Sequence, residues 1–220
     1  MATRSEKRIT VAEYERMIEE GLLTEDDRVE LLEGVIVEMS PIGVPHATAV
    51  NNLNRFFARH APDDVIVSVQ NPTRLSDFSQ PQPDLLLYRP VAGRNARHHP
   101  LPAETLLLVE VSDSTLAYDR DEKVPSYAAA GVTEVWIVDI EGRRLLRYRE
   151  PADGIYGVQE SLVASQSLAP TALPALTISS AVRVRNNGNP CPSCALAPAS
   201  ILVLSAGARL KFRPGSPSLR

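Results

Sequence analysis

The chain contains 220 residues, of which 44% are apolar and 23% are charged, a composition typical of a folded globular protein rather than a disordered one. The short apolar runs exclude a helix that spans a membrane, and two cysteines exclude a framework of disulfide bonds. The N-terminal residues carry charges but no apolar stretch of the kind found in secretory signals. We therefore expect a cytoplasmic protein without a membrane partner.

The net charge of −4 is unevenly distributed along the chain. Residues 1–180 carry a net charge of −10, whereas residues 181–220 contain six basic residues and no acidic residue. An acidic body argues against non-specific electrostatic binding of nucleic acid by the core as a whole. We therefore divide the chain into one domain over residues 1–184 and an atypical basic, proline-containing tail over residues 185–220, which we expect to be disordered or loosely packed.

The N-terminal part of the chain is predicted to contain a helix, a hairpin and a second helix. Thr10 and Glu13 have the spacing of a capping box, so a helix is expected to begin after Thr10. Residues 28–39 are rich in alternating and β-branched side chains on both sides of a Glu-Gly pair, which predicts a β-hairpin. An apolar stripe over residues 46–60 predicts the second helix.

The middle of the chain is predicted to form a mixed sheet. Residues 105–112 are almost continuously apolar, as expected of a central strand buried on both faces. A helix over residues 119–130 would connect this strand to one over residues 134–139, which makes the two strands parallel through a right-handed crossover. The order helix, three strands, helix, strand predicts an α/β fold with a mixed central sheet flanked by helices. Further strands are expected over residues 64–70, 82–88, 143–149, 155–163 and 176–182.

Two acidic residues lie in strands that are expected to be buried. Asp84 lies near the start of the strand over residues 82–88, and Glu110 lies near the end of the apolar strand over residues 105–112. A buried carboxylate is costly unless a cation compensates it. Carboxylate and carbonyl oxygens suit Mg²⁺ or Mn²⁺, and such an ion activates water and stabilises the charge of a phosphodiester during cleavage. The pattern therefore predicts a site for Mg²⁺ or Mn²⁺.

Several short segments follow one another in a specific order, although each is weak by itself. They are Arg28-Val-Glu-Leu-Leu-Glu-Gly-Val-Ile-Val-Glu-Met-Ser-Pro41, His46, Gln82-Pro-Asp-Leu-Leu-Leu87, Leu108-Val-Glu-Val-Ser112, Asp119-Arg-Asp-Glu-Lys123, Tyr127 and Gly131-Val-Thr-Glu-Val-Trp-Ile-Val-Asp139. On these segments the chain resembles the PD-(D/E)xK nuclease superfamily and, more narrowly, the Uma-type (Uma-two) family of restriction-endonuclease-like proteins, over about residues 8–182. The resemblance implies a restriction-endonuclease-like core of order α-β-β-β-α-β, preceded by an N-terminal helix and hairpin. It also implies a Mg²⁺-dependent endonuclease that hydrolyses phosphodiester bonds in DNA.

The resemblance implies roles for individual residues. Asp84 matches the aspartate of the PD motif and Glu110 matches the following acid, and both would bind the metal ion. The usual lysine two residues after this acid is absent, because Ser112 stands there. Lys123 on the next helix would replace it, positioning or helping to deprotonate the attacking water and offsetting phosphate charge. Glu30 matches an acidic residue from the N-terminal segment and would complete the metal site.

Four further residues are candidates to support these groups or to contact substrate, namely His46, Gln82, Ser112 and Asp119. Each assignment has a purely structural alternative. Asp84 would cap a turn, Lys123 would be a solvated charge on a helix, Glu30 would face solvent from the hairpin, and His46 would cap its helix. Tyr127 and Trp136 are expected in the core.

Other functions stay open at this stage. Pro125 lies two residues after Lys123, which requires a helix that starts late or is kinked and makes the direction of the lysine uncertain. The main alternative is a catalytically inactive nuclease-fold module that binds DNA or protein, and another is a phosphodiesterase that acts on RNA or nucleotides. A loop over residues 89–104 (with Arg89, Arg94, Arg97, His98 and His99) is the candidate DNA contact, and a solvated loop is its alternative. A homodimer would cut both strands most simply.

Overall fold

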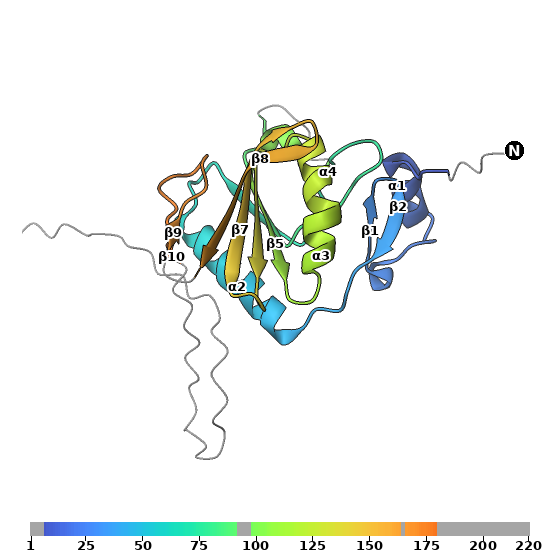
Figure 1. Ribbon diagram of the computed structural model, residues 1–220. Helices are drawn as coiled ribbons and strands as arrows, with labels where there is room; N and C mark the ends of the chain where they lie inside the picture. Colours follow the sequence, from blue (N-terminus) through green and yellow to red (C-terminus); the bar gives the residue numbers. More distant parts are fainter. Residues whose placement is uncertain (1–6, 92–97, 164–165, 180–220) are drawn as a thin grey trace, which may run out of the picture.

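A six-stranded mixed β-sheet forms the centre of the protein in the computed structural model, which describes residues 7–91, 98–163 and 166–179 (Figure 1). The strands lie in the order β3-β4-β5-β6-β7-β8, and within the described sheet only β5 and β6 run parallel. The predicted parallel pair is therefore confirmed. The strand bounds are Ile66–Val69 for β3, Leu85–Tyr88 for β4, Thr105–Ser112 for β5, Glu134–Asp139 for β6, Arg144–Ala152 for β7 and Ile155–Val163 for β8.

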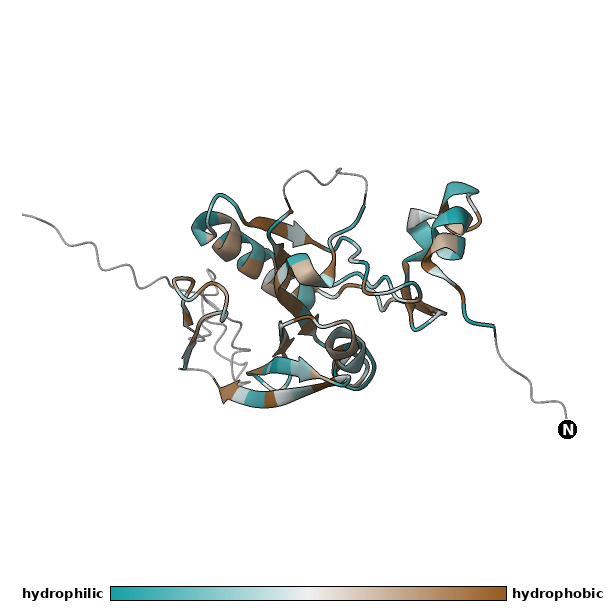
Figure 2. Ribbon diagram, turned by 90° about the horizontal axis from the view of Figure 1, so that it is seen from above, coloured by the Kyte–Doolittle hydropathy of each residue, from teal (hydrophilic) through white to brown (hydrophobic). Residues whose placement is uncertain are grey.

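Helices cover both faces of this sheet (Figure 1). Because side chains alternate along a strand, neighbouring residues of β6 serve different layers. Trp136 packs with Phe57 of helix α2, whereas Ile137 packs with Tyr127 on the other face. Figure 2 shows the central strands as the most hydrophobic part of the fold. The covering elements are α2 (Val44–His60) on one face, and α3 (Leu116–Tyr118), η3 (Asp119–Lys123) and α4 (Val124–Ala129) on the other.

A small N-terminal unit lies beyond α3 and α4 (Figure 1). The predicted capping box is present, because Thr10 Oγ1 accepts a hydrogen bond from Glu13 N and the Glu13 carboxylate accepts one from Thr10 N. The predicted hairpin is also present and turns at Gly34, where φ is 81°. A bridge between Leu31 and Gln80 connects it to the main body. The elements are α1 (Val11–Glu19), η1 (Glu25–Asp27), β1 (Val29–Leu32) and β2 (Val35–Glu38).

The helix predicted over residues 119–130 contains a π-helical turn. The helical backbone already begins at Leu116. Over η3 the helix is wider than an α-helix, because Val124 N donates to the Asp119 carbonyl five residues earlier. Pro125 has no N–H and cannot make the α-helical bond to the carbonyl four residues before it. A π turn next to this position accommodates the missing bond. Pro125 thus lies in the first turn of α4, while the helical path continues upstream of it.

Other predicted bounds differ from the structure by a few residues, among them those of β3 (Ile66–Val69, predicted over residues 64–70) and β7 (Arg144–Ala152, predicted over residues 143–149). α2 begins at Val44 rather than at residue 46, with a proline in its first turn. β4 begins at Leu85 rather than at residue 82. The short remaining elements are η2 (Pro102–Glu104), β9 (Ser167–Leu168) and β10 (Ile178–Ser179).

Part of the sequence-based picture falls outside the described residues. The predicted tail over residues 185–220 is one such part, and Arg94 and Arg97 of the candidate DNA-contact loop are another. In the same loop, Arg89 forms an ion pair with Asp64 at 2.6 Å. Among the helices that the structure describes, none is long and apolar enough to cross a membrane.

Candidate active site

The strand register brings Asp84 and Glu110 together. β4 and β5 pair antiparallel with Leu85 opposite Val109, so the next residue pair in the same register is Asp84 and Glu110. Residues directly opposite each other on paired strands point to the same face of the sheet. Here that face is the one covered by α3, η3 and α4, because Leu86 and Leu108 pack with Tyr127. Both predicted metal ligands therefore occupy one place in the fold.

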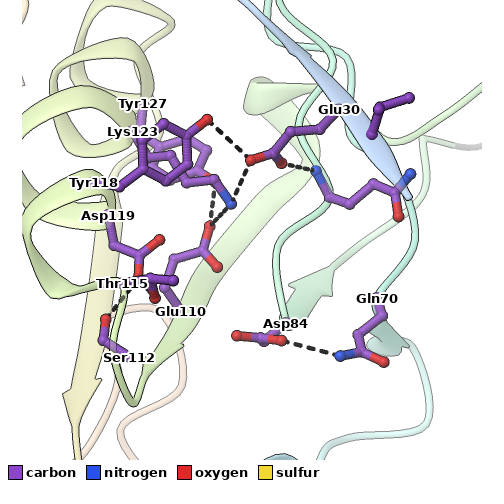
Figure 3. A network of polar contacts seen from close by, with 12 residues as sticks. Glu30, Gln70, Asp84, Glu110, Ser112, Thr115, Tyr118, Asp119, Lys123 and Tyr127 are labelled. Carbon is purple, nitrogen blue, oxygen red and sulfur yellow. Dashed lines mark hydrogen bonds and ion pairs between the residues drawn. The ribbon is translucent and has the colours of Figure 1, made fainter. Parts of the chain in front are cut away.

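The hydrogen-bonded pairing of β4 with β5 stops at this point because β4 begins only at Leu85. The residue that would follow in the ladder opposite Val111 is Pro83, which has no N–H to donate. The Asp84 carboxylate takes over part of the ladder, since Oδ2 accepts from Val111 N at 2.8 Å. Asp84 also contacts His46 Nε2 at 3.0 Å. It accepts a hydrogen bond from Gln70 Nε2 at 3.2 Å (Figure 3). Asp84 is thus held by three neighbours, and the hydrogen bond with Asp84 raises the pKa of His46.

Lys123 lies between two buried carboxylates. Its Nζ is 3.1 Å from Glu110 Oε1 and 3.1 Å from Glu30 Oε1 (Figure 3). All three side chains are at most 6% exposed. Burial alone would lower the pKa of Lys123, but attraction by Glu110, Glu30 and Asp119 raises it instead. The lysine is therefore a stable cation inside the fold.

Glu110 has one occupied and one free oxygen. Lys123 and Tyr127 both donate to Oε1, whereas Oε2 has no hydrogen-bond partner among the described residues and is directed toward Asp84 in Figure 3. Burial raises the pKa of the Glu110 carboxyl to about 8, although Lys123 opposes this shift. Without a bound cation, Glu30 balances Lys123, and Glu110 keeps its proton near neutral pH.

The remaining predicted residues support this arrangement. Asp119 Oδ2 accepts from Ser112 Oγ and Thr115 Oγ1, both at 2.7 Å, and burial raises the pKa of Asp119. Gln82 acts through its backbone, because Gln82 N donates to Glu30 Oε2 at 2.9 Å.

A cleft of about 720 Å³ gives access to the site. Seven of the eight predicted site residues line it, and these are Glu30, His46, Gln82, Asp84, Glu110, Asp119 and Lys123. Ser112 is fully buried and does not line the cleft, but its hydroxyl donates a hydrogen bond to Asp119, which does. The structure therefore brings together almost the whole set of residues that the sequence singled out.

The donor set fits a small divalent cation. Asp84 and Glu110 supply carboxylate oxygens on one face, and Glu110 Oε2 is free to accept a new partner. In the part of the chain that the structure describes, no three His, Cys, Asp or Glu side chains converge into a metal cage. Mg²⁺ does not require one, because it commonly binds one or two carboxylates and keeps several waters.

Sequence reasoning missed three residues of the network. Gln70 reaches Asp84 from the end of β3, and Tyr118 donates to Glu30 Oε1 at 3.1 Å. Tyr127 is in the core as predicted, but its hydroxyl also contacts Glu110. Gln70 and Tyr118 belong to none of the segments that carry the family resemblance. Tyr127 does belong to one, but it was expected in the core alone.

Comparison with known proteins agrees with this fold, which is that of a nuclease-like α/β protein. The profile of the Uma2 family, described as "Putative restriction endonuclease", matches residues 11–183, and the chain belongs to this family. A solved structure from Anabaena variabilis, described as "a putative nuclease belonging to DUF820", has a TM-score of 0.58 with this protein at 13% sequence identity. The match covers 75% of this chain and 91% of that one, and at such identity it shows the shared fold alone. No curated protein matches the chain.

Proposed function

We propose that this protein is a metal-dependent endonuclease that hydrolyses phosphodiester bonds in DNA. The observation that carries the proposal is the pairing of Asp84 with Glu110 in one register, with the ammonium group of Lys123 beside them. Membership of the Uma2 family supports nuclease activity independently of this geometry.

Asp84 and Glu110 would hold Mg²⁺ or Mn²⁺. Such an ion lowers the pKa of a bound water and stabilises the negative charge that develops on the phosphate. For Glu110 to bind it, the carboxyl proton must leave, because only the ionised carboxylate is a ligand. Metal ligation by Glu30 stays a prediction, since its oxygens already contact Lys123, Tyr118 and Gln82 N and one contact would have to be exchanged.

Lys123 would orient the attacking water and offset phosphate charge. Its raised pKa disfavours a role as a proton acceptor, because a general base must be unprotonated at working pH. A fixed cation next to a dianionic transition state acts electrostatically instead. The family resemblance implied that Lys123 positions the attacking water or helps to deprotonate it, and the raised pKa favours positioning.

His46 and Gln70 would keep the Asp84 carboxylate in place. They contact both of its oxygens from α2 and from the end of β3. Groups that fix a metal ligand preserve its geometry when the ion binds.

The test is cleavage of supercoiled plasmid DNA by the purified protein in Mg²⁺ or Mn²⁺, with EDTA as the control. We expect nicked product only with the metal, and none from Asp84→Ala or Lys123→Ala. Asp64→Ala is the matched control, because Asp64 is an exposed aspartate outside the cleft. Unchanged cleavage by both site variants would refute the assigned site.

An alternative outcome would identify a binding module. Wild-type protein that binds DNA but shows no cleavage and no metal affinity by calorimetry would favour the inactive nuclease-fold reading. A panel of DNA, RNA and nucleotide substrates separates the proposed substrate from related phosphodiesters. Analytical ultracentrifugation tests the predicted homodimer.

A further inference from the structure

The N-terminal hairpin carries a second feature of the cleft. Building on the proposed function, we infer that Arg28 binds a backbone phosphate of the DNA next to the phosphate that is cleaved. The inference rests on the place of this guanidinium, on its lack of a partner in the protein and on its backbone conformation.

Arg28 lies beside the proposed catalytic groups. It directly precedes β1 and lines the same cleft as Asp84, Glu110 and Lys123. Glu30, two residues later on the same strand, contacts Lys123 Nζ. Arg28 and Glu30 therefore line the cleft together. A strand of DNA whose scissile phosphate lies near Lys123 would pass Arg28 with a neighbouring phosphate.

Arg28 is the cationic group of the cleft that is still available. The other basic residues that line it are engaged, Lys123 with Glu30 and Glu110, and His46 with Asp84. By contrast, Arg28 is only half-buried, and its guanidinium makes no hydrogen bond or ion pair with any side chain that the structure describes. This is notable in a cleft lined by six acidic residues, namely Glu30, Glu38, Asp84, Glu110, Asp113 and Asp119.

The backbone at Arg28 is in the left-handed region, with φ 44° and ψ 60°. This conformation is unfavourable for a side chain with a Cβ atom, and glycine or asparagine adopts it more readily. Hydrogen bonds of the Arg28 side chain within the described protein do not offset this strain. Strained residues of this kind concentrate where a side chain serves a ligand.

The guanidinium group selects phosphate by its shape. Its planar fork donates two parallel hydrogen bonds to a phosphate, which the compact ammonium of lysine does not reproduce. Such a contact positions the DNA backbone and is independent of base sequence. Arg28 would therefore contribute affinity and register rather than sequence preference.

The experiment measures DNA binding by Arg28→Gly, using fluorescence anisotropy of a labelled duplex oligonucleotide at several salt concentrations. Glycine relieves the left-handed strain while it removes the guanidinium, so binding and stability should change in opposite senses. We expect binding to weaken at least tenfold and the melting temperature to stay unchanged or rise. The magnitude of the slope of log K against log salt should fall by about 0.9, the value for one lost phosphate contact on duplex DNA.

Arg143→Gly is the matched control. Arg143 also has positive φ (51°), but it is exposed in the turn before β7 and does not line the cleft. Its replacement should leave binding within twofold of the wild type. Arg28→Lys should keep the salt slope and lose part of the affinity.

The outcomes separate this inference from the proposed function. If the wild type and Arg28→Gly bind DNA within twofold of each other with the same salt slope, the role of Arg28 is wrong while the proposed function stands. A lower melting temperature in Arg28→Gly would assign the arginine to folding and overturn the inference. If the wild type itself does not bind DNA, the proposed function and this inference both fail.

Discussion

The Nζ atom of Lys123 lies 3.1 Å from Oε1 of Glu110, although the two residues belong to different elements, a π-helical turn and a central strand. The lysine that the resemblance to the PD-(D/E)xK pattern implies two residues after Glu110 is absent, because Ser112 stands there. The helical crossover between the parallel strands returns a lysine to the same face of the sheet. Lys123 of η3 therefore supplies the positive charge that position 112 of β5 lacks.

Replacing Lys123 by methionine should affect both stability and activity. The substitution leaves Glu30 without its buried counter-ion and is expected to lower the free energy of unfolding by about 3–5 kcal/mol. Cleavage should be lost, because no other described cation lies between Glu30 and Glu110. Urea denaturation and plasmid nicking measure the two effects. Lys7→Met, at an exposed ion pair with Glu13, should cost less than about 1 kcal/mol, and similar losses in both variants would contradict the assignment.

Asp84→Asn should separate metal binding from folding. An asparagine oxygen still accepts the hydrogen bond from Val111 N, so the start of β4 keeps its contact with β5. The negative charge that attracts the metal is lost, and we expect affinity for Mn²⁺ to fall at least tenfold by calorimetry, with a circular dichroism spectrum like that of the wild type. Asp64→Asn is the control on the outer surface. Equal affinities in the two variants would remove Asp84 from the metal site.

Local sequence signals predicted much of the fold. The capping box at Thr10 and the Glu-Gly turn of the hairpin depend on residues close together in the chain, and both are present. The apolar strand over residues 105–112 has the predicted bounds, because its composition differs sharply from that of its neighbours. The convergence of Asp84 with Glu110 followed from family motifs combined with strand pairing.

Other parts of the site depend on three-dimensional packing and carry no local signal. Gln70 reaches Asp84 only because β3 pairs with β4, and Tyr118 reaches Glu30 only because the hairpin docks beside α3. The free guanidinium of Arg28 becomes evident only when the partners of the other cations are known. Pro125 indicated an irregular helix, but the π turn depends on the hydrogen bond that Val124 makes.

Pro125→Ala tests whether this proline maintains the π turn. Alanine restores an N–H that would bond to the carbonyl four residues earlier and would let the turn tighten into an α-helix. Tightening would rotate Lys123 away from Glu110, so we expect roughly tenfold slower cleavage together with a lower thermal stability, because the buried ion pair weakens. Ala129→Pro is unsuitable as a control because it breaks the helix; Glu122→Ala, at an exposed position of η3, is the better comparison. An unchanged rate in Pro125→Ala would show that the carboxylates, rather than the proline, fix the lysine.

Glu110 should make the stability of the metal-free protein depend on pH. Its pKa is raised from 4.5 to about 8 by burial, so between these values the unfolded chain loses the proton while the folded protein keeps it. The folded state then binds more protons, and its stability falls as pH rises from about 4.5 to about 8. Glu110→Gln cannot ionise and should remove this part of the pH dependence, on the order of a few kcal/mol. Urea denaturation in EDTA at pH 5, 6, 7 and 8 measures the difference between the two proteins. A constant difference across this range would mean that Glu110 ionises at its ordinary pKa in the folded state.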